Sequence, residues 1–122
     1  MSIALAGLTL GVHLLTLHSA PGYESQNLGL YGRHAPSGIT AGLYRNSEGR
    51  ASFYLGETFE TADRRFALTV GAVTGYRSRS LAPLVVPSLR LGDDDLAVRL
   101  SLIPKPPGAN AWGLHLSVER EF

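Results

Sequence analysis

The alternation of apolar and polar residues is the feature of this chain that most limits its fold. Over much of its length the sequence changes character at every second residue rather than at every third or fourth. A period of two is typical of β-strands with two unlike faces, because successive side chains point to opposite sides. The pattern therefore predicts an all-β protein. It is clearest where Trp112, Leu114, Leu116 and Val118 alternate with Gly113, His115, Ser117 and Glu119.

Turn-forming sequences separate the alternating segments. They are "APGYESQN", "APSG", "NSEG", "TADRR", "GDDD" and "PKPPGAN", in which Gly, Pro, Asn, Asp and Ser are frequent. These residues favour turns because they tolerate or impose special backbone angles. No segment has the period of a helix. The predicted strands cover residues 4–17, 28–34, 37–45, 51–59, 66–76, 84–91, 95–103 and 111–121.

Eight short strands with tight connections predict an eight-stranded antiparallel meander β-barrel. Closing the sheet removes the exposed edges that an open sheet would present, and a two-sheet sandwich is the alternative. Several of the 14 glycines fall within predicted strands and favour the strong coiling of a small barrel. The length of 122 residues suits one domain over residues 1–122.

The composition argues against several kinds of site. A formal net charge of +1 gives no reason to expect binding to a nucleic acid polymer. The chain has no cysteine, which excludes disulfides, cysteine zinc sites and thiol catalysis. His13, His34 and His115 fall on different predicted strands without the spacing of metal ligands, and "GDDD" lacks the alternation of a calcium loop. We therefore predict no metal and no cofactor.

A membrane barrel and a soluble barrel differ in whether the apolar faces of their strands point outward or inward. A membrane barrel turns its apolar faces outward, needs strands of about 9–11 residues and carries aromatic residues at both interfaces. Several predicted strands are shorter, and the chain has one Trp and five Tyr. The first twenty residues lack the basic start of a signal peptide and predict a strand. We therefore predict apolar faces inward, polar faces outward and a soluble protein.

Four segments resemble, in their order along the chain, the outer-membrane lipid A palmitoyltransferase family. They are "TLHS" (16–19), "GLYRNSEGR" (42–50), "LTVGAVTGYRSRSLAPLVVPS" (68–88) and "SLIPKPPGANAWGLHLSVEREF" (101–122). The resemblance implies an eight-stranded barrel that holds an acyl chain in its interior. It places His18 and Ser47 at the positions of the family's catalytic His and Ser, and Asn46 where the family has Asp. An acyltransferase or esterase with these residues is the enzymatic alternative.

The pattern around "TAGLYRNSEGR" (40–50) is also similar to that of small proteins carried by tailed bacteriophages and prophages. This similarity implies a protein of the host cytoplasm, with the outer membrane as the alternative location. It favours a barrel that binds a small anionic host molecule, such as a nucleotide signal, over an enzyme. A virion or assembly protein is a further alternative, and a homo-oligomer stays open.

Arginine and tyrosine residues near the strand ends form the predicted site for an anionic ligand. Arg45 and Arg50 flank the "NSEG" corner, and Tyr76 and Arg77 lie at the end of the fifth predicted strand. In a meander these ends share one rim, whereas Arg33 lies at the opposite rim. Guanidinium groups grip anions in two-pronged fashion, and a tyrosine ring offers a stacking surface.

The "NSEG" corner also has a purely structural interpretation. Four residues between two predicted strands form a hairpin loop when some of them adopt positive φ. Asn46 and Gly49 are the residues here that tolerate positive φ, and Ser47 and Glu48 are ordinary central residues of such a loop. The sequence is therefore consistent with both a site and a turn.

Overall fold

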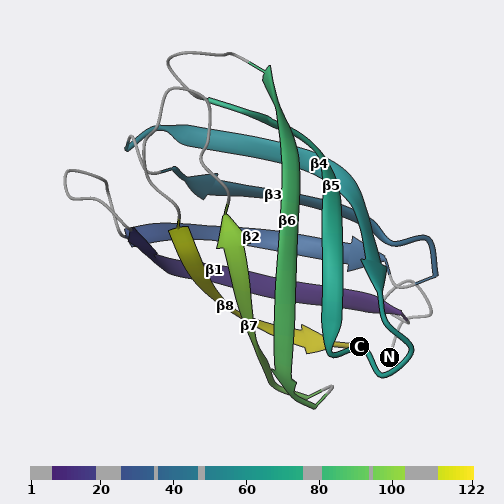
Figure 1. Cartoon of the computed structure of the whole chain (residues 1–122). Helices are drawn as coiled ribbons and strands as arrows, with labels where there is room; N and C mark the ends of the chain where they lie inside the picture. The colour runs from purple at the N-terminus through teal and green to yellow at the C-terminus, as the bar shows by residue number, and fades with distance from the viewer. Residues whose placement is uncertain are drawn as a thin grey trace.

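The protein is a closed barrel of antiparallel strands in a computed structural model that describes residues 7–18, 26–34, 36–46, 49–75, 81–93, 95–103 and 113–122 (Figure 1). The strands follow the order of the sequence around the barrel, and the first pairs with the last. The predicted all-β meander barrel is confirmed. The described residues include no helix with the length and apolar character to cross a bilayer. The strands are β1 (Leu8–His18), β2 (Gln26–His34), β3 (Ile39–Arg45), β4 (Ala51–Glu60), β5 (Phe66–Thr74), β6 (Leu81–Gly92), β7 (Ala97–Ile103) and β8 (Gly113–Glu121).

The two ends of the barrel carry different connections. At one end, which we call the terminal rim, the backbone N–H of Gly7 donates to the carbonyl of Phe122 at 3.0 Å, and the N–H of Phe122 donates to the carbonyl of Leu8 at 2.8 Å. Consecutive strands run in opposite directions, so every second connection returns to this rim. The connections at the terminal rim are 35–38, 61–65 and 93–96, and those at the opposite end, the loop rim, are 19–25, 46–50, 75–80 and 104–112.

The apolar faces of the strands point away from the barrel interior. In β4, Phe53, Leu55 and Phe59 are exposed by 64%, 62% and 53%, whereas Ser52 and Thr58 are buried. The prediction that the apolar faces point inward is therefore wrong. The alternation of apolar and polar residues is the same whether the apolar faces point inward or outward, so the sequence pattern could not decide between the two arrangements. Other exposed large apolar side chains are Leu10, Val12, Leu15, Leu17, Leu28, Leu30, Ile39, Leu43, Phe66, Leu68, Leu81, Val85, Leu91, Leu96, Leu102, Leu114 and Phe122.

Charged side chains on the outer face of the described strands stand near the strand ends. Arg45 is the last residue of β3, at the loop rim. Glu57 and Arg120 are exposed in β4 and β8, close to the ends of these strands at the terminal rim. Between these levels the outer positions of the described strands carry no charged residue. The barrel thus has an apolar belt with charges at its two borders.

The interior of the barrel is mostly polar. Buried charged residues lie inside it, and a charge removed from water is stable only when it is paired and hydrogen-bonded. The interior therefore depends on specific contacts rather than on apolar packing alone. Its buried polar residues are Thr9, Thr16, Arg33, Thr40, Ser52, Thr58, Arg99, Ser101, His115, Ser117 and Glu119.

Candidate functional site

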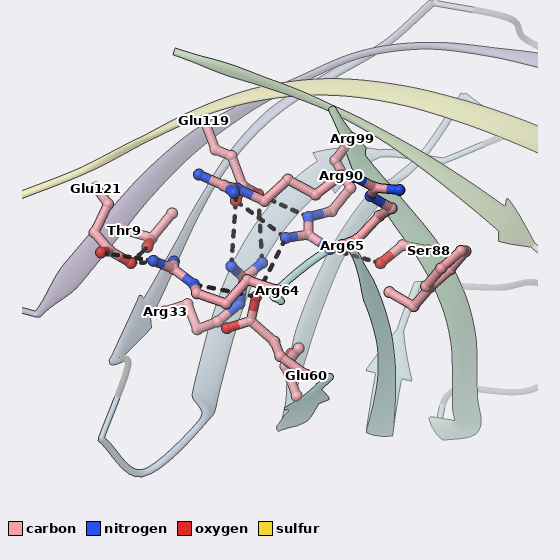
Figure 2. Close-up of polar contacts among 12 residues, drawn as sticks. Thr9, Arg33, Glu60, Arg64, Arg65, Ser88, Arg90, Arg99, Glu119 and Glu121 are labelled. Atoms are coloured by element: carbon pink, nitrogen blue, oxygen red, sulfur yellow. Dashed lines mark hydrogen bonds and ion pairs between the residues drawn. The ribbon is translucent and has the colours of Figure 1, made fainter. Parts of the chain in front are cut away.

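A network of ion pairs centred on Glu119 fills the interior near the terminal rim (Figure 2). Arg99 donates to the Glu119 carboxylate from Nε at 2.8 Å and from Nη2 at 3.1 Å, and the hydroxyl of Tyr31 donates to it at 2.6 Å. Arg33 and Arg90 form further ion pairs with it at 3.4 and 3.8 Å. One buried carboxylate therefore interacts with three guanidinium groups of the interior.

A second part of the network binds Arg64, which belongs to the connection 61–65 (Figure 2). Arg64 forms an ion pair with Glu121, and its Nε lies 3.8 Å from Oε2 of Glu60. The same Glu60 oxygen lies 3.8 Å from Nη2 of Arg99, which joins the two parts. The charged network thus connects β4, β7 and β8 near the terminal rim. Arg64 has a φ of 60°, which is uncommon for a residue other than glycine.

The turn that carries Arg64 is fixed by the carboxylate of Asp63. This carboxylate accepts a hydrogen bond from the hydroxyl of Thr61 at 2.6 Å and from the backbone N–H of Arg65 at 3.0 Å. These bonds, the one from Thr61 first, stabilise the ionised form and lower the pKa of Asp63. The turn therefore retains its anchoring carboxylate in the charged form at neutral pH.

A chain of hydrogen-bonded side chains links β8, β1 and β4 across the interior. His115 binds the Thr16 hydroxyl through Nδ1 at 2.8 Å. Nε2 of His115 lies 2.8 Å from Nδ1 of His13, and Nε2 of His13 lies 2.8 Å from the Tyr54 hydroxyl. The two histidines are 102 positions apart in the sequence and meet because barrel closure pairs β1 with β8. A β-bulge between His13 and Leu15 interrupts the register there, and the inward-facing Thr16 follows it.

An apolar cluster occupies the interior beside β3, β4, β5 and β6. Val73 and Ala82 are exposed by only 3% and 2%, and Tyr44, Tyr54 and Leu84 pack against them. Tyr54 belongs to two groups, because its ring packs in this cluster while its hydroxyl ends the histidine chain. The interior therefore contains an apolar region beside a polar one.

The pairing between β6 and β7 ends partway along β6. The register runs from Gly92 opposite Ala97 to Ser88 opposite Ser101, and within the described residues 81–87 have no partner in β7. Figure 1 shows β6 continuing past the end of β7. Among the described residues, the β6 edge at 81–87 on the loop-rim side of this ladder therefore has no β7 partner.

Two prolines explain why the ladder stops. The N–H of Arg90 donates to the carbonyl of Arg65 at 2.6 Å, on the β5 side of β6. The register with β5 is regular, so even-numbered residues of β6 direct their N–H groups toward β5 and odd-numbered residues toward β7. Pro83 and Pro87 are odd-numbered and have no N–H. They remove two of the donors that a longer ladder with β7 would need.

The corner at 46–50 is a hairpin turn held by Asn46. Nδ2 of this residue donates to Oγ of Ser52 and to the carbonyl of Gly75, both at 2.9 Å, and its Oδ1 accepts from the N–H of Arg50 at 3.1 Å. The Asn46 side chain is fully buried. Of the two residues that tolerate positive φ, Gly49 adopts it, with a φ of 76°, and Asn46 does not. The role of Asn46 here is structural, because its hydrogen bonds hold the turn to Ser52 and Gly75.

The structure describes the predicted site residues only in part. Arg45 and Arg50 are exposed at the loop rim. Arg33 lies near the terminal rim, as predicted, but it is buried in the ion-pair network. Neither the proposed His–Ser pair nor the complete arginine and tyrosine cluster is brought together by described residues. Outside the description lie Ser47, Tyr76, Arg77 and the side chain of His18.

The interior residues are the ones that sequence reasoning missed as a possible site. The sequence places His13 and His115 on separate strands, and the predicted direction of the faces puts Glu119 on the outside. The available signal was the recurrence of charged and histidine residues at alternate positions of several strands. That signal becomes informative only when the faces carrying these residues are known to meet inside the barrel.

A comparison of the chain with models of known protein families and with curated proteins finds no match. Among the described residues no group of three or more His, Cys, Asp or Glu is arranged to hold a metal ion.

Proposed function

We propose that this chain is a membrane-spanning β-barrel of the outer-membrane type that binds a lipid acyl chain in its interior. The observation that carries the membrane assignment is the belt of exposed Leu, Val and Phe around a polar interior. Such a belt is unfavourable in water, where each Å² of apolar surface costs about 25 cal/mol relative to burial. Facing lipid, the same belt is favourable. Charges at both borders, such as Arg45 and Glu57, suit the headgroup levels.

The backbone supports the same proposal. A closed barrel pairs backbone N–H and C=O groups between neighbouring strands, which a bilayer requires because its core contains no water to bind them. Six strands have nine to twelve residues, in the range that crosses a bilayer, and β3 and β7 have seven. Connections that are mostly shorter at one rim than at the other are typical of such barrels.

Three features favour an acyl chain as the ligand. Ala82 and Leu84 belong both to the apolar cluster and to the part of β6 that lacks a described β7 partner. An apolar chain that enters there would pass from the membrane to the cluster without crossing water. The ion-pair network around Glu119 occupies the interior near the terminal rim, so the apolar cluster is the part of the interior that suits an acyl chain. The resemblance to the lipid A palmitoyltransferase family implies the same type of ligand.

Refolding tests the membrane assignment. The full chain, diluted from urea into detergent micelles or lipid vesicles, is expected to gain β-structure by circular dichroism. The unheated protein should then migrate differently from the boiled protein on a denaturing gel. Dilution into detergent-free buffer should give aggregates, because the apolar belt would face water. A folded, monodisperse protein in detergent-free buffer would contradict the assignment.

A disulfide between β6 and β7, beyond the last pair of their described ladder, tests acyl-chain entry separately. Continuing the register places Val86 opposite Ile103, so the double variant Val86→Cys, Ile103→Cys should close the edge when it is oxidised. The chain has no other cysteine. Binding of a spin-labelled fatty acid should be lost in the oxidised form and return on reduction. The control is Leu89→Cys with Leu100→Cys, which joins positions that already pair and should leave binding intact. Equal binding by both oxidised variants would refute entry through this edge.

A small anionic ligand at the loop rim is the second candidate function. The bond from Asn46 to the carbonyl of Gly75 supports it, because this bond joins the connections that contain Arg50 and Tyr76. Thermal shift with nucleotide second messengers should detect stabilisation that Arg45→Ala reduces. Arg120→Ala, at the other border of the belt, is the control and should retain the full shift. No stabilising nucleotide at millimolar concentration would reject this candidate.

A further inference from the structure

We propose that His13 and His115 form a binding site for a transition-metal ion inside the barrel. The site does not depend on whether the barrel lies in a membrane. Nδ1 of His13 and Nε2 of His115 face each other at 2.8 Å. His115 is buried, and the two rings are held by partners on their other nitrogens, the hydroxyls of Tyr54 and Thr16. Two imidazole nitrogens from neighbouring strands thus point toward each other.

The distance between the two nitrogens is close to what a metal needs. Metal–imidazole bonds of about 2.0–2.1 Å in tetrahedral geometry place the two nitrogens about 3.3 Å apart. The nitrogens would therefore have to separate by about 0.5 Å, and both rings would have to turn so that their lone pairs converge beside the line joining the two nitrogens. The interruption of the β1 register beside His13 puts this adjustment at an irregular point of the strand.

The outer hydrogen bonds are those that a metal-bound histidine pair requires. A ligating imidazole presents one bare nitrogen to the metal and donates the N–H of its other nitrogen to a nearby acceptor. Here Nε2 of His13 can donate to the Tyr54 hydroxyl, and Nδ1 of His115 can donate to the Thr16 hydroxyl. Each neutral ring keeps one proton before and after binding. In the metal-bound state these protons are on the outer nitrogens, Nε2 of His13 and Nδ1 of His115. No proton then lies between the two rings.

The chemistry of the pair selects the class of ion. Imidazole suits Cu²⁺, Ni²⁺ and Zn²⁺, whereas Mg²⁺ and Ca²⁺ prefer oxygen ligands. No carboxylate of the described residues is hydrogen-bonded in the chain of His13, His115, Thr16 and Tyr54. With two protein ligands, the remaining coordination positions would be filled by water or by an added molecule. Cu²⁺ is the best probe, because it binds imidazole most strongly in this series.

Electron paramagnetic resonance of Cu²⁺ bound to the folded full chain tests the site. The background variant His18→Gln, His34→Gln removes the other two histidines of the chain. We expect one bound Cu²⁺ whose spectrum shows two equivalent nitrogen ligands. His13→Gln and His115→Gln should each remove the two-nitrogen signal. A folded background protein without this signal, or a signal that survives His115→Gln, would overturn the proposal.

Variants of Tyr54 and Thr16, whose hydroxyls bind the outer nitrogens, provide a second test if a histidine variant fails to fold. Tyr54→Phe and Thr16→Val leave both imidazoles in place but remove the acceptors that orient them. Each should weaken Cu²⁺ affinity by roughly 10–100-fold while the two-nitrogen spectrum persists at saturation. Ser52→Ala, which changes a buried hydroxyl bound to Asn46, is the control and should leave the affinity unchanged. Unchanged affinity in both hydroxyl variants would contradict the proposal that these hydroxyls orient the metal-binding imidazoles, and the site with it.

Discussion

The ring of Tyr54 occupies the space that a side chain at Gly42 would need, since a Cβ atom on Gly42 would stand 2.6 Å from this ring. The two residues are opposite each other in the ladder between β3 and β4. Gly42→Ala should therefore overpack the wall and lower the free energy of unfolding by about 1–3 kcal/mol. Urea titration of the folded protein measures this change. Gly32→Ala is the control, because its new Cβ would meet its nearest atom at 3.7 Å. Similar losses in both variants would argue against the packing of Tyr54.

The apolar belt predicts a large effect of an outward charge in the middle of a strand. Leu55 is 62% exposed near the centre of β4. In a bilayer, Leu55→Arg should reduce the free energy of unfolding by about 2–4 kcal/mol, because the guanidinium would face hydrocarbon. Phe59→Arg, near the terminal rim, should cost about 0–1 kcal/mol. Unfolding measured in lipid vesicles compares the two. A change within about 0.5 kcal/mol for Leu55→Arg is what a water-facing surface would give.

Removal of Glu119 should be among the most damaging single changes in the interior. Its carboxylate compensates Arg99 and Arg33, and without it these buried charges lose their main partner. Breaking a buried ion pair by removing one partner costs about 3–5 kcal/mol. Glu119→Ala should therefore destabilise the barrel by an amount in this range, measured by denaturant unfolding. Glu57→Ala, an exposed carboxylate, should change stability by less than about 0.5 kcal/mol. Equal effects would mean that the buried network contributes no more than a surface charge.

The hairpin corner distinguishes a structural from a catalytic role of Asn46. Asn46→Asp introduces the residue that the lipid A palmitoyltransferase family has at this position. It also replaces the amide that donates to Ser52 and to the carbonyl of Gly75 by a carboxylate that cannot donate. A loss of about 1–3 kcal/mol in stability is expected, because a buried acceptor loses its donor. Thermal unfolding measures it. A stable Asn46→Asp variant that gains esterase or acyl-transfer activity would favour the enzymatic alternative.

The sequence predicted the strands well because alternation and turn residues are local properties. The main error in their bounds is at β6, which was expected to begin at residue 84 and begins at Leu81. Proline usually ends a central strand because it lacks an N–H. Pro83 lies within β6 because its missing N–H faces the side on which no described residue of β7 pairs with it. The start of this strand therefore depended on a neighbour that is distant in sequence.

The direction of the faces could not be read from alternation. Leu114 and His115 alternate in β8 whether the leucine or the histidine points inward. What distinguishes the two cases is whether the polar residues find partners across the interior, as His115 does with His13. Such contacts depend on barrel closure and on the β1 bulge. The bulge cannot be read from alternation either, although it changes the register of β1 between His13 and Leu15.

The unequal lengths of the ladders divide the barrel into two halves. Within the described residues, the ladders β2–β3 and β6–β7 have five residue pairs each, and every other ladder has seven or nine. The longer ladders hold together two sheets of four strands, β7-β8-β1-β2 and β3-β4-β5-β6. A closed barrel opens by separating two neighbouring strands. Separating the strands of the shortest ladders breaks the fewest backbone hydrogen bonds and costs the least free energy. Amide hydrogen exchange should therefore find two cooperative units in this small barrel, joined where the chain runs through 35–38 and 93–96.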